Sequence, residues 1–169
     1  NRLRSLGVTV IEHEGSYVEA VEEGRLQCMK DPCSYFIDDE NSKDLFLGYS
    51  TAALRLEKRL NTLGIPVDND NPLFVYLPCG VGGAPGGISF GLKHIYGDSV
   101  KCYFAEPVNA PSVMLGLIEK RKINFSEFGF IMETDADGLA VDSPSELILK
   151  ICGNLIDGTY TVPDEVMYS

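Results

Sequence analysis

The sequence predicts an α/β protein built as three layers, with a mostly parallel, twisted sheet and helices on both faces. Strand-like and helix-like segments alternate along the chain, which is typical of layered α/β structures. The runs 73–77 and 100–105 are apolar without strict alternation, as expected for parallel strands that are buried on both faces. We therefore expect strands at 8–11, 34–37, 73–77 and 100–105 in one sheet.

Length and composition narrow the class of protein. The chain has 169 residues, which suits a single α/β domain over 1–169 with a sizeable core. The net charge of -11 and the lack of a basic cluster argue against nucleic acid and anionic membranes as partners. No apolar stretch reaches the roughly 18 residues of a membrane span, and no signal peptide is recognisable after Asn1. The five cysteines form neither a C-x-x-C pair nor a zinc-ligand set, so we expect reduced thiols and a cytoplasmic protein.

The first part of the chain predicts strand, helix, strand. The β-branched run 8–11 reads as a short strand. Ser16 is expected to cap a helix that ends near Met29, because Glu19 three positions later completes a capping box. The strand 34–37 follows.

The acidic segment 38–42 comes directly after this strand. Its carboxylates are compatible with a metal site, but no histidine is nearby, and a polar turn is the favoured interpretation. A helix is predicted over 51–63 and ends at Gly64. Its expected buried stripe consists of Leu54, Leu56, Leu60 and Leu63.

Residues 73–97 carry the clearest functional pattern. A buried strand leads into a glycine-rich loop, Gly80–Ala84, and Pro85 then suits the first turn of a helix that ends at Gly97. The backbone N–H groups of such a loop and the positive end of its helix converge on one spot, which favours a bound phosphate. Gly87 and Gly91 are expected to let this helix approach the sheet closely.

The kind of phosphate site can be narrowed. A dinucleotide fingerprint fails because Pro85 occupies the position of its third glycine. A P-loop fails because Ile88 and Ser89 follow the glycines where lysine and Ser or Thr belong. A phosphate cup made of backbone groups remains, and the alternative is a glycine-rich turn without a ligand.

The last part predicts two more helices. The apolar strand 100–105 completes a right-handed β–α–β unit and places Glu106 at its carboxyl end, where open parallel sheets bind ligands. A helix over 112–119 follows. Another is expected over 143–157, with Ser143 as its cap, and ends at Gly158.

Three segments resemble a known family: Leu77–Gly87, Cys102–Pro107 and Ala136–Val141. Together they are similar to the bacterial D-serine ammonia-lyases (D-serine dehydratases), which belong to the fold-type II enzymes that depend on pyridoxal phosphate. The similarity extends over nearly the whole chain. Ala84 departs from the family, which usually has another glycine there. The resemblance implies that this chain is part of the larger, cofactor-binding domain.

The resemblance also implies a set of site residues. The residues implied for binding pyridoxal 5'-phosphate are Gly80, Val81, Gly82, Gly83 and Ala84 around the phosphate, and Asp137 and Gly138 beside the ring. Glu106 and the Ala110 carbonyl match a cation site of the family, and one carboxylate with carbonyls suits a hard monovalent or divalent cation. The alternative is that Glu106 caps the helix 112–119.

One family feature has no counterpart here. The family forms its Schiff base through a lysine in a Ser-x-Lys-Ala-Arg-like segment, and no lysine of this chain has that context. We therefore expect a middle fragment of the enzyme, without a catalytic residue of its own and inactive without the rest of its polypeptide. The implied reaction is β-elimination of D-serine to pyruvate and ammonia. The alternatives are a related serine/threonine dehydratase or racemase and, in another class, a non-catalytic phosphate- or nucleotide-binding domain.

Overall fold

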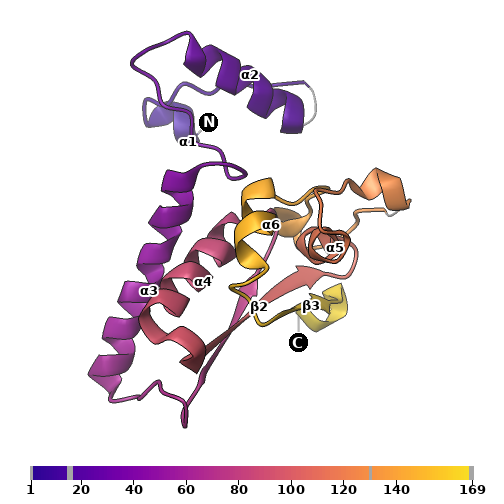
Figure 1. Ribbon diagram of the computed structural model, residues 1–169. Helices are drawn as coiled ribbons and strands as arrows, with labels where there is room; N and C mark the ends of the chain where they lie inside the picture. Colours follow the sequence, from indigo (N-terminus) through magenta and orange to yellow (C-terminus); the bar gives the residue numbers. More distant parts are fainter. Residues whose placement is uncertain (1, 15–16, 130, 168–169) are drawn as a thin grey trace. The chain divides into compact units, whose positions relative to one another are not determined.

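A computed structural model describes residues 2–14, 17–129 and 131–167. The chain forms two compact units, residues 1–38 (the N-terminal unit) and 39–169 (the C-terminal unit). All strands found among the described residues belong to the C-terminal unit (Figure 1). The prediction that residues 1–169 belong to a single α/β domain therefore stays a prediction. The predicted cap Ser16 lies outside the described residues.

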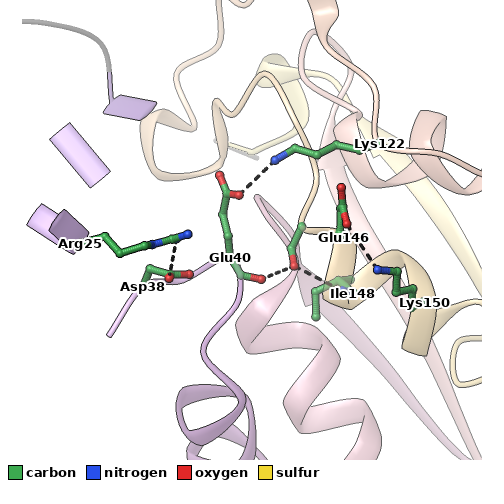
Figure 2. Close-up of polar contacts among 8 residues, drawn as sticks. Arg25, Asp38, Glu40, Lys122, Glu146, Ile148 and Lys150 are labelled. Carbon is green, nitrogen blue, oxygen red and sulfur yellow. Dashed lines mark hydrogen bonds and ion pairs between the residues drawn. The ribbon is translucent and has the colours of Figure 1, made fainter. Parts of the chain in front are cut away.

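The N-terminal unit contains two helices, α1 (Arg2–Ser5) and α2 (Tyr17–Met29). Segments 8–11 and 34–37 have no regular secondary structure, so their prediction as strands is wrong. A β-branched run becomes a strand only when a neighbouring strand takes up its backbone groups, and neither segment has such a partner among the described residues. Arg25 pairs with Asp38 at 3.0 Å, an ion pair that Figure 2 shows.

The C-terminal unit contains a parallel sheet of three strands, β1 (Leu73–Pro78), β2 (Val100–Pro107) and β3 (Gly158–Val162), in the order β1-β2-β3. This sheet confirms the α/β class and the strands predicted at 73–77 and 100–105. The strand β3 was not predicted, because Gly158 was interpreted only as a helix stop. This strand is short, and it joins the sheet by pairing in parallel with the second half of β2.

Helices and turns complete the C-terminal unit. Its helices are α3 (Lys43–Leu63), α4 (Gly83–Tyr96), α5 (Ser112–Glu119), α6 (Glu146–Cys152) and α7 (Asp164–Met167), and its 3-10 turns are η1 (Gly97–Ser99), η2 (Phe125–Phe128) and η3 (Asp137–Leu139). Helix α5 has the predicted bounds. Helix α3 begins earlier than predicted because the Ser42 hydroxyl accepts the Leu45 N–H and caps it there. Helix α6 begins later than predicted, after Ser145.

Helices α3, α4, α5 and α6 pack on one face of the sheet. Val100, Cys102 and Phe104 alternate along β2 and contact side chains of α3, α4, α5 and α6. The opposite face carries a group of rings that we call the aromatic cluster, Phe74, Tyr76, Tyr103 and Tyr160. Tyr76 is 59% exposed and Tyr160 is 49% exposed, so this face is open to solvent in the structure.

Helices α3 and α4 lie side by side (Figure 1) and owe their closeness to two glycines. A Cβ atom at Gly91 would lie 2.6 Å from the Ser50 carbonyl oxygen, and one at Gly87 would overlap the Phe46 carbonyl oxygen. The prediction that these glycines bring α4 close to the sheet is therefore wrong. They let α4 approach α3.

The buried stripe of α3 agrees with the prediction only in part. Leu60 is buried and Leu56 packs against the core, as predicted. Phe46, Ala53 and Leu60, spaced seven residues apart, face the core. Leu54 and Leu63 point to solvent, because the line of contact with α4 runs along the opposite side. No described helix is both long and apolar enough to pass through a membrane.

Candidate functional site

The glycine loop, defined as Gly80–Ala84, joins β1 to α4. The Cys79 N–H still donates to the Ala105 carbonyl at 2.9 Å, so the loop leaves directly from the carboxyl end of the sheet. The chain turns at Gly82, whose φ of +100° lies in the left-handed region that favours glycine. A Cβ atom at Gly82 would also lie 2.6 Å from the Ile148 side chain. Conformation and packing thus both require glycine at this position.

The first three carbonyl groups of the loop all accept hydrogen bonds. The donors are the Ser112 hydroxyl for Gly80 (3.4 Å), the Ser145 N–H for Val81 (3.1 Å) and the Gly86 N–H for Gly82 (2.9 Å). A carbonyl and the N–H of the next residue share one planar peptide and point in opposite directions. Because the carbonyls are anchored, the N–H groups that follow them turn away from these partners.

The N–H groups of the loop have no acceptor among the described residues: no hydrogen bond there uses the N–H of any residue from 80 to 84. The loop is partly buried, and unpaired N–H groups away from water cost free energy. The amino end of α4 adds partial positive charge at the same place. A row of free N–H groups at a helix start fits a phosphate.

The structure brings the second predicted segment to this loop. Turn η3 contains Asp137 and Gly138, and a Cβ atom at Gly80 would lie 3.3 Å from the Gly138 carbonyl oxygen. Asp39, which the sequence placed only in a polar turn, also borders the loop, because a Cβ atom at Gly83 would lie 3.0 Å from its carbonyl oxygen. Gly138 and Asp39 therefore both border the glycine loop.

Glu106 is 1% exposed and caps helix α5. Its two carboxylate oxygens accept the N–H groups of Val113 (2.8 Å) and Met114 (2.9 Å). Burial raises the pKa of Glu106 to about 7, although both N–H bonds act in the opposite direction. The Ala110 carbonyl accepts the Ser112 N–H at 3.0 Å. The capping alternative is confirmed, and the cation at Glu106 and Ala110 stays a prediction.

Two residues of the site were missed in the sequence. Ser112 and Ser145 anchor the carbonyl groups of the loop, yet they follow it by many residues. Ser112 carried no more signal than its place at a helix start. At the second helix start Ser143 and Pro144 gave the stronger cap signal, and Ser145 was overlooked.

A pocket of about 680 Å³ lies away from this site. Leu117 of α5, Leu149 of α6 and Gly158 at the start of β3 are among its lining residues, and no residue of the glycine loop is. It therefore lies at the amino end of β3, whereas parallel sheets bind ligands at their carboxyl ends. The glycine loop remains the better candidate.

Comparison with known proteins identifies the family. All residues from 1 to 169 match the family described as "Pyridoxal-phosphate dependent enzyme". The chain belongs to this family. Its cofactor carries a phosphate group, which is the kind of anion that the free N–H groups of the glycine loop suit.

The curated relatives of this chain include two with closely similar sequences. A "Probable D-serine dehydratase" of Carboxydothermus hydrogenoformans is 58% identical over 168 residues, and one of Geobacillus stearothermophilus is 56% identical over 168 residues. The matches cover 98% of this chain but 40% and 37% of those proteins. The chain thus spans about 40% of the length of the curated relatives that it matches.

Solved structures of similar fold include two threonine deaminases. The one described as from "T.th." has a TM-score of 0.81 at 22% identity and matches 98% of this chain and 50% of its own. The processed isoform 2 from Solanum lycopersicum has a TM-score of 0.76 at 26% identity, with coverage of 95% and 43%. Maize serine racemase has a TM-score of 0.75 at 21% identity, with coverage of 98% and 46%. At such identities the likeness establishes the fold of this family member.

Proposed function

We propose that this chain is the phosphate-binding part of a D-serine dehydratase, an ammonia-lyase that converts D-serine to pyruvate and ammonia. The observation that carries the proposal is the glycine loop, whose N–H groups are free while its carbonyls are anchored. The choice of D-serine as the substrate rests on the relatives that are named probable D-serine dehydratase. When bound, pyridoxal phosphate withdraws electrons from the α-carbon of the amino acid and so permits loss of water from the β-carbon.

The residues of this chain have binding and orienting roles in the proposal. The N–H groups of Gly80, Val81, Gly82, Gly83 and Ala84 bind the cofactor phosphate. Asp137 and Gly138 line the site beside the cofactor ring, next to Gly80. Holding the phosphate fixes the position of the cofactor against its substrate. We assign the lysine that attaches the cofactor to the rest of the polypeptide, because no lysine of this chain lies in a Ser-x-Lys-Ala-Arg-like segment.

The reaction is tested on the full-length protein, loaded with cofactor. We expect pyruvate and ammonia from D-serine, and much slower release from L-serine and from the threonine enantiomers. Faster release from L-serine or threonine, or conversion of D-serine to L-serine, would instead identify a related dehydratase or racemase. A full-length protein that takes up no cofactor, as judged by its absorbance in the visible region, would identify a non-catalytic phosphate-binding protein.

A cytoplasmic location belongs to the same proposal. None of the five cysteines is in a disulfide. Burial raises the pKa of the Cys79 thiol and raises that of Cys152 to about 12, so both stay protonated and unreactive at neutral pH. Buried, reduced thiols suit a reducing compartment.

A cation near Glu106 remains a secondary part of the proposal. Each Glu106 oxygen already accepts one N–H group, which leaves further lone pairs for a cation, with the Ala110 carbonyl as a second oxygen ligand. Dependence of cofactor affinity on potassium or magnesium, lost in Glu106→Gln, is the expected result. If cofactor affinity does not depend on either cation, the proposal of a cation site at Glu106 is wrong.

A further inference from the structure

Ser145 is completely buried at the start of α6, and its N–H and hydroxyl groups form three hydrogen bonds with three segments of the C-terminal unit. Its partners are the Val81 carbonyl, which accepts the Ser145 N–H at 3.1 Å, the Glu40 carbonyl, which accepts the hydroxyl proton, and the Ile148 N–H, which donates to the hydroxyl oxygen at 3.3 Å. One residue therefore joins the glycine loop, the segment before α3 and the first turn of α6.

The bond to Val81 determines the orientation of one peptide in the glycine loop. The Val81 carbonyl and the Gly82 N–H belong to the same planar group, so fixing the carbonyl directs the N–H to the opposite side. Glycine-rich loops have many accessible conformations, and ordering them costs conformational entropy. An anchor that exists before the ligand arrives keeps the N–H group ready for a phosphate.

The hydroxyl of Ser145 keeps its N–H group in position. It bonds on one side to the Glu40 carbonyl and on the other to the first turn of α6. Glu40 is itself held, because its carboxylate pairs with Lys122 at 3.1 Å, and Figure 2 shows this pair together with Ile148 at the start of α6. Ser145 bonds to the loop through its backbone N–H, whereas Ser112 bonds to it through its hydroxyl, and that bond is weaker at 3.4 Å.

We propose that Ser145 is a positioning residue of the cofactor phosphate site: it sets the direction of the Val81–Gly82 peptide without touching the cofactor. The inference rests on the proposed function, because it assumes that the glycine loop binds the phosphate. It predicts that a substitution at Ser145 affects cofactor binding as well as the stability of the fold. Loss of the hydroxyl loosens both the cap of α6 and the loop, and so weakens phosphate binding in addition to stability.

The test uses the full-length protein and three readouts. These are the dissociation constant of pyridoxal phosphate, the ³¹P chemical shift of the bound phosphate and the thermal unfolding of the cofactor-free protein. In Ser145→Ala we expect cofactor affinity to fall about tenfold, the size of one lost hydrogen bond, and the ³¹P resonance to move toward that of free cofactor. Both substitutions keep the backbone N–H, but glycine remains an acceptable cap, so Ser145→Gly preserves folding if Ser145→Ala does not, with the same expected changes at the phosphate.

Ser42→Ala is the matched control. Ser42 caps α3 through the Leu45 N–H at 3.2 Å, and no hydrogen bond joins it to the glycine loop in the described chain. This variant should lower the unfolding temperature and leave cofactor affinity and the ³¹P shift unchanged. If Ser145→Ala and Ser145→Gly behave in the same way as Ser42→Ala, Ser145 is only a cap and the inference is overturned.

Gly82→Asp separates this inference from the function on which it rests. If Gly82→Asp abolishes cofactor binding while both Ser145 variants bind normally, the glycine loop is the phosphate site and only the role of Ser145 fails. If Gly82→Asp binds cofactor with unchanged affinity, the phosphate lies elsewhere, and the proposed function of the loop fails together with the role of Ser145.

Discussion

Gly82 is the residue of the site at which a side chain should do most damage. Its φ of +100° disfavours any other residue, and its Cβ would meet Ile148. Aspartate there would add a negative charge beside the phosphate. We expect Gly82→Asp to weaken cofactor binding in the full-length protein by a few kcal/mol, the order of a lost set of charge-assisted hydrogen bonds. Gly64→Asp is the matched control, because Gly64 also has a positive φ, of 67°, but open space around it.

Glu106 should make stability depend on pH. Its folded pKa of about 7 exceeds the unfolded value of about 4.3. The unfolded chain therefore loses its proton first as the pH rises. The stabilising contribution is complete below about pH 4 and is lost by about pH 7, a change of about 3 kcal/mol. In Glu106→Gln we expect the free energy of unfolding not to decrease in this way between about pH 4 and pH 7. Parallel curves for the two proteins between pH 4 and 7 would contradict the assignment.

At the scale of elements, Asp157 connects β3 to its neighbours. One of its oxygens accepts the Cys102 N–H and the Lys93 ammonium, both at 2.9 Å, and Lys101 lies 3.4 Å from the other. Burial alone would raise the pKa of Asp157, but the bonds from Lys93 and Cys102 outweigh it and lower the pKa. The stability that the carboxylate provides is thus present above its unfolded pKa of about 3.9 and is lost as the pH falls below that value.

Asp157→Asn should consequently destabilise the protein by about 1 to 3 kcal/mol at pH 7, the range for hydrogen bonds to charged groups. The difference from the unchanged protein should shrink in acid. Glu146→Gln is the comparison, because Glu146 pairs with Lys150 at 3.3 Å on an exposed helix surface (Figure 2). That change should cost less than about 0.5 kcal/mol. Equal losses in the two variants would show that Asp157 is an ordinary surface charge.

Elements whose signal is local could be predicted from the sequence. A pattern of a few consecutive residues was enough to predict the apolar run 73–77, the glycine loop and the helix 112–119. Segments 8–11 and 34–37 failed because a strand needs a partner, and no local pattern says whether one is available. The residues that anchor the loop could not be predicted for the same reason. The glycines of the loop indicate locally that its N–H groups are accessible, whereas Ser145 is distant in the sequence and contacts the loop only in the folded chain.

At the scale of the molecule, the chain by itself should be inactive. It belongs to a family of pyridoxal-phosphate dependent enzymes, but none of its lysines lies in a Ser-x-Lys-Ala-Arg-like segment. We expect no cofactor-dependent release of pyruvate from D-serine by the purified 169-residue chain, measured alongside the full-length protein. Pyruvate release by the chain alone would place a catalytic lysine among its own residues.

The aromatic cluster should be covered in the full-length protein. Parallel sheets are normally buried on both faces, and the relatives contain more than half of their length beyond this match. We expect the remaining polypeptide to pack on this face. Tyr76 and Tyr160 should react readily with tetranitromethane in the isolated chain and be protected in the full-length protein. Equal nitration in both would mean that the face stays open.

The aromatic cluster also has an optical consequence. The chain contains no tryptophan, so tyrosine and phenylalanine provide its near-ultraviolet absorption. The ring centre of Tyr103 lies 5.3 Å from that of Tyr76 and 5.4 Å from that of Tyr160, so one ring from each of the three strands belongs to a chiral group of neighbouring chromophores. Their coupled circular dichroism would register the pairing of β1, β2 and β3. It would do so at wavelengths well away from the visible band of a bound pyridoxal cofactor. Sheet assembly and cofactor uptake could then be followed separately in one sample, with no label attached.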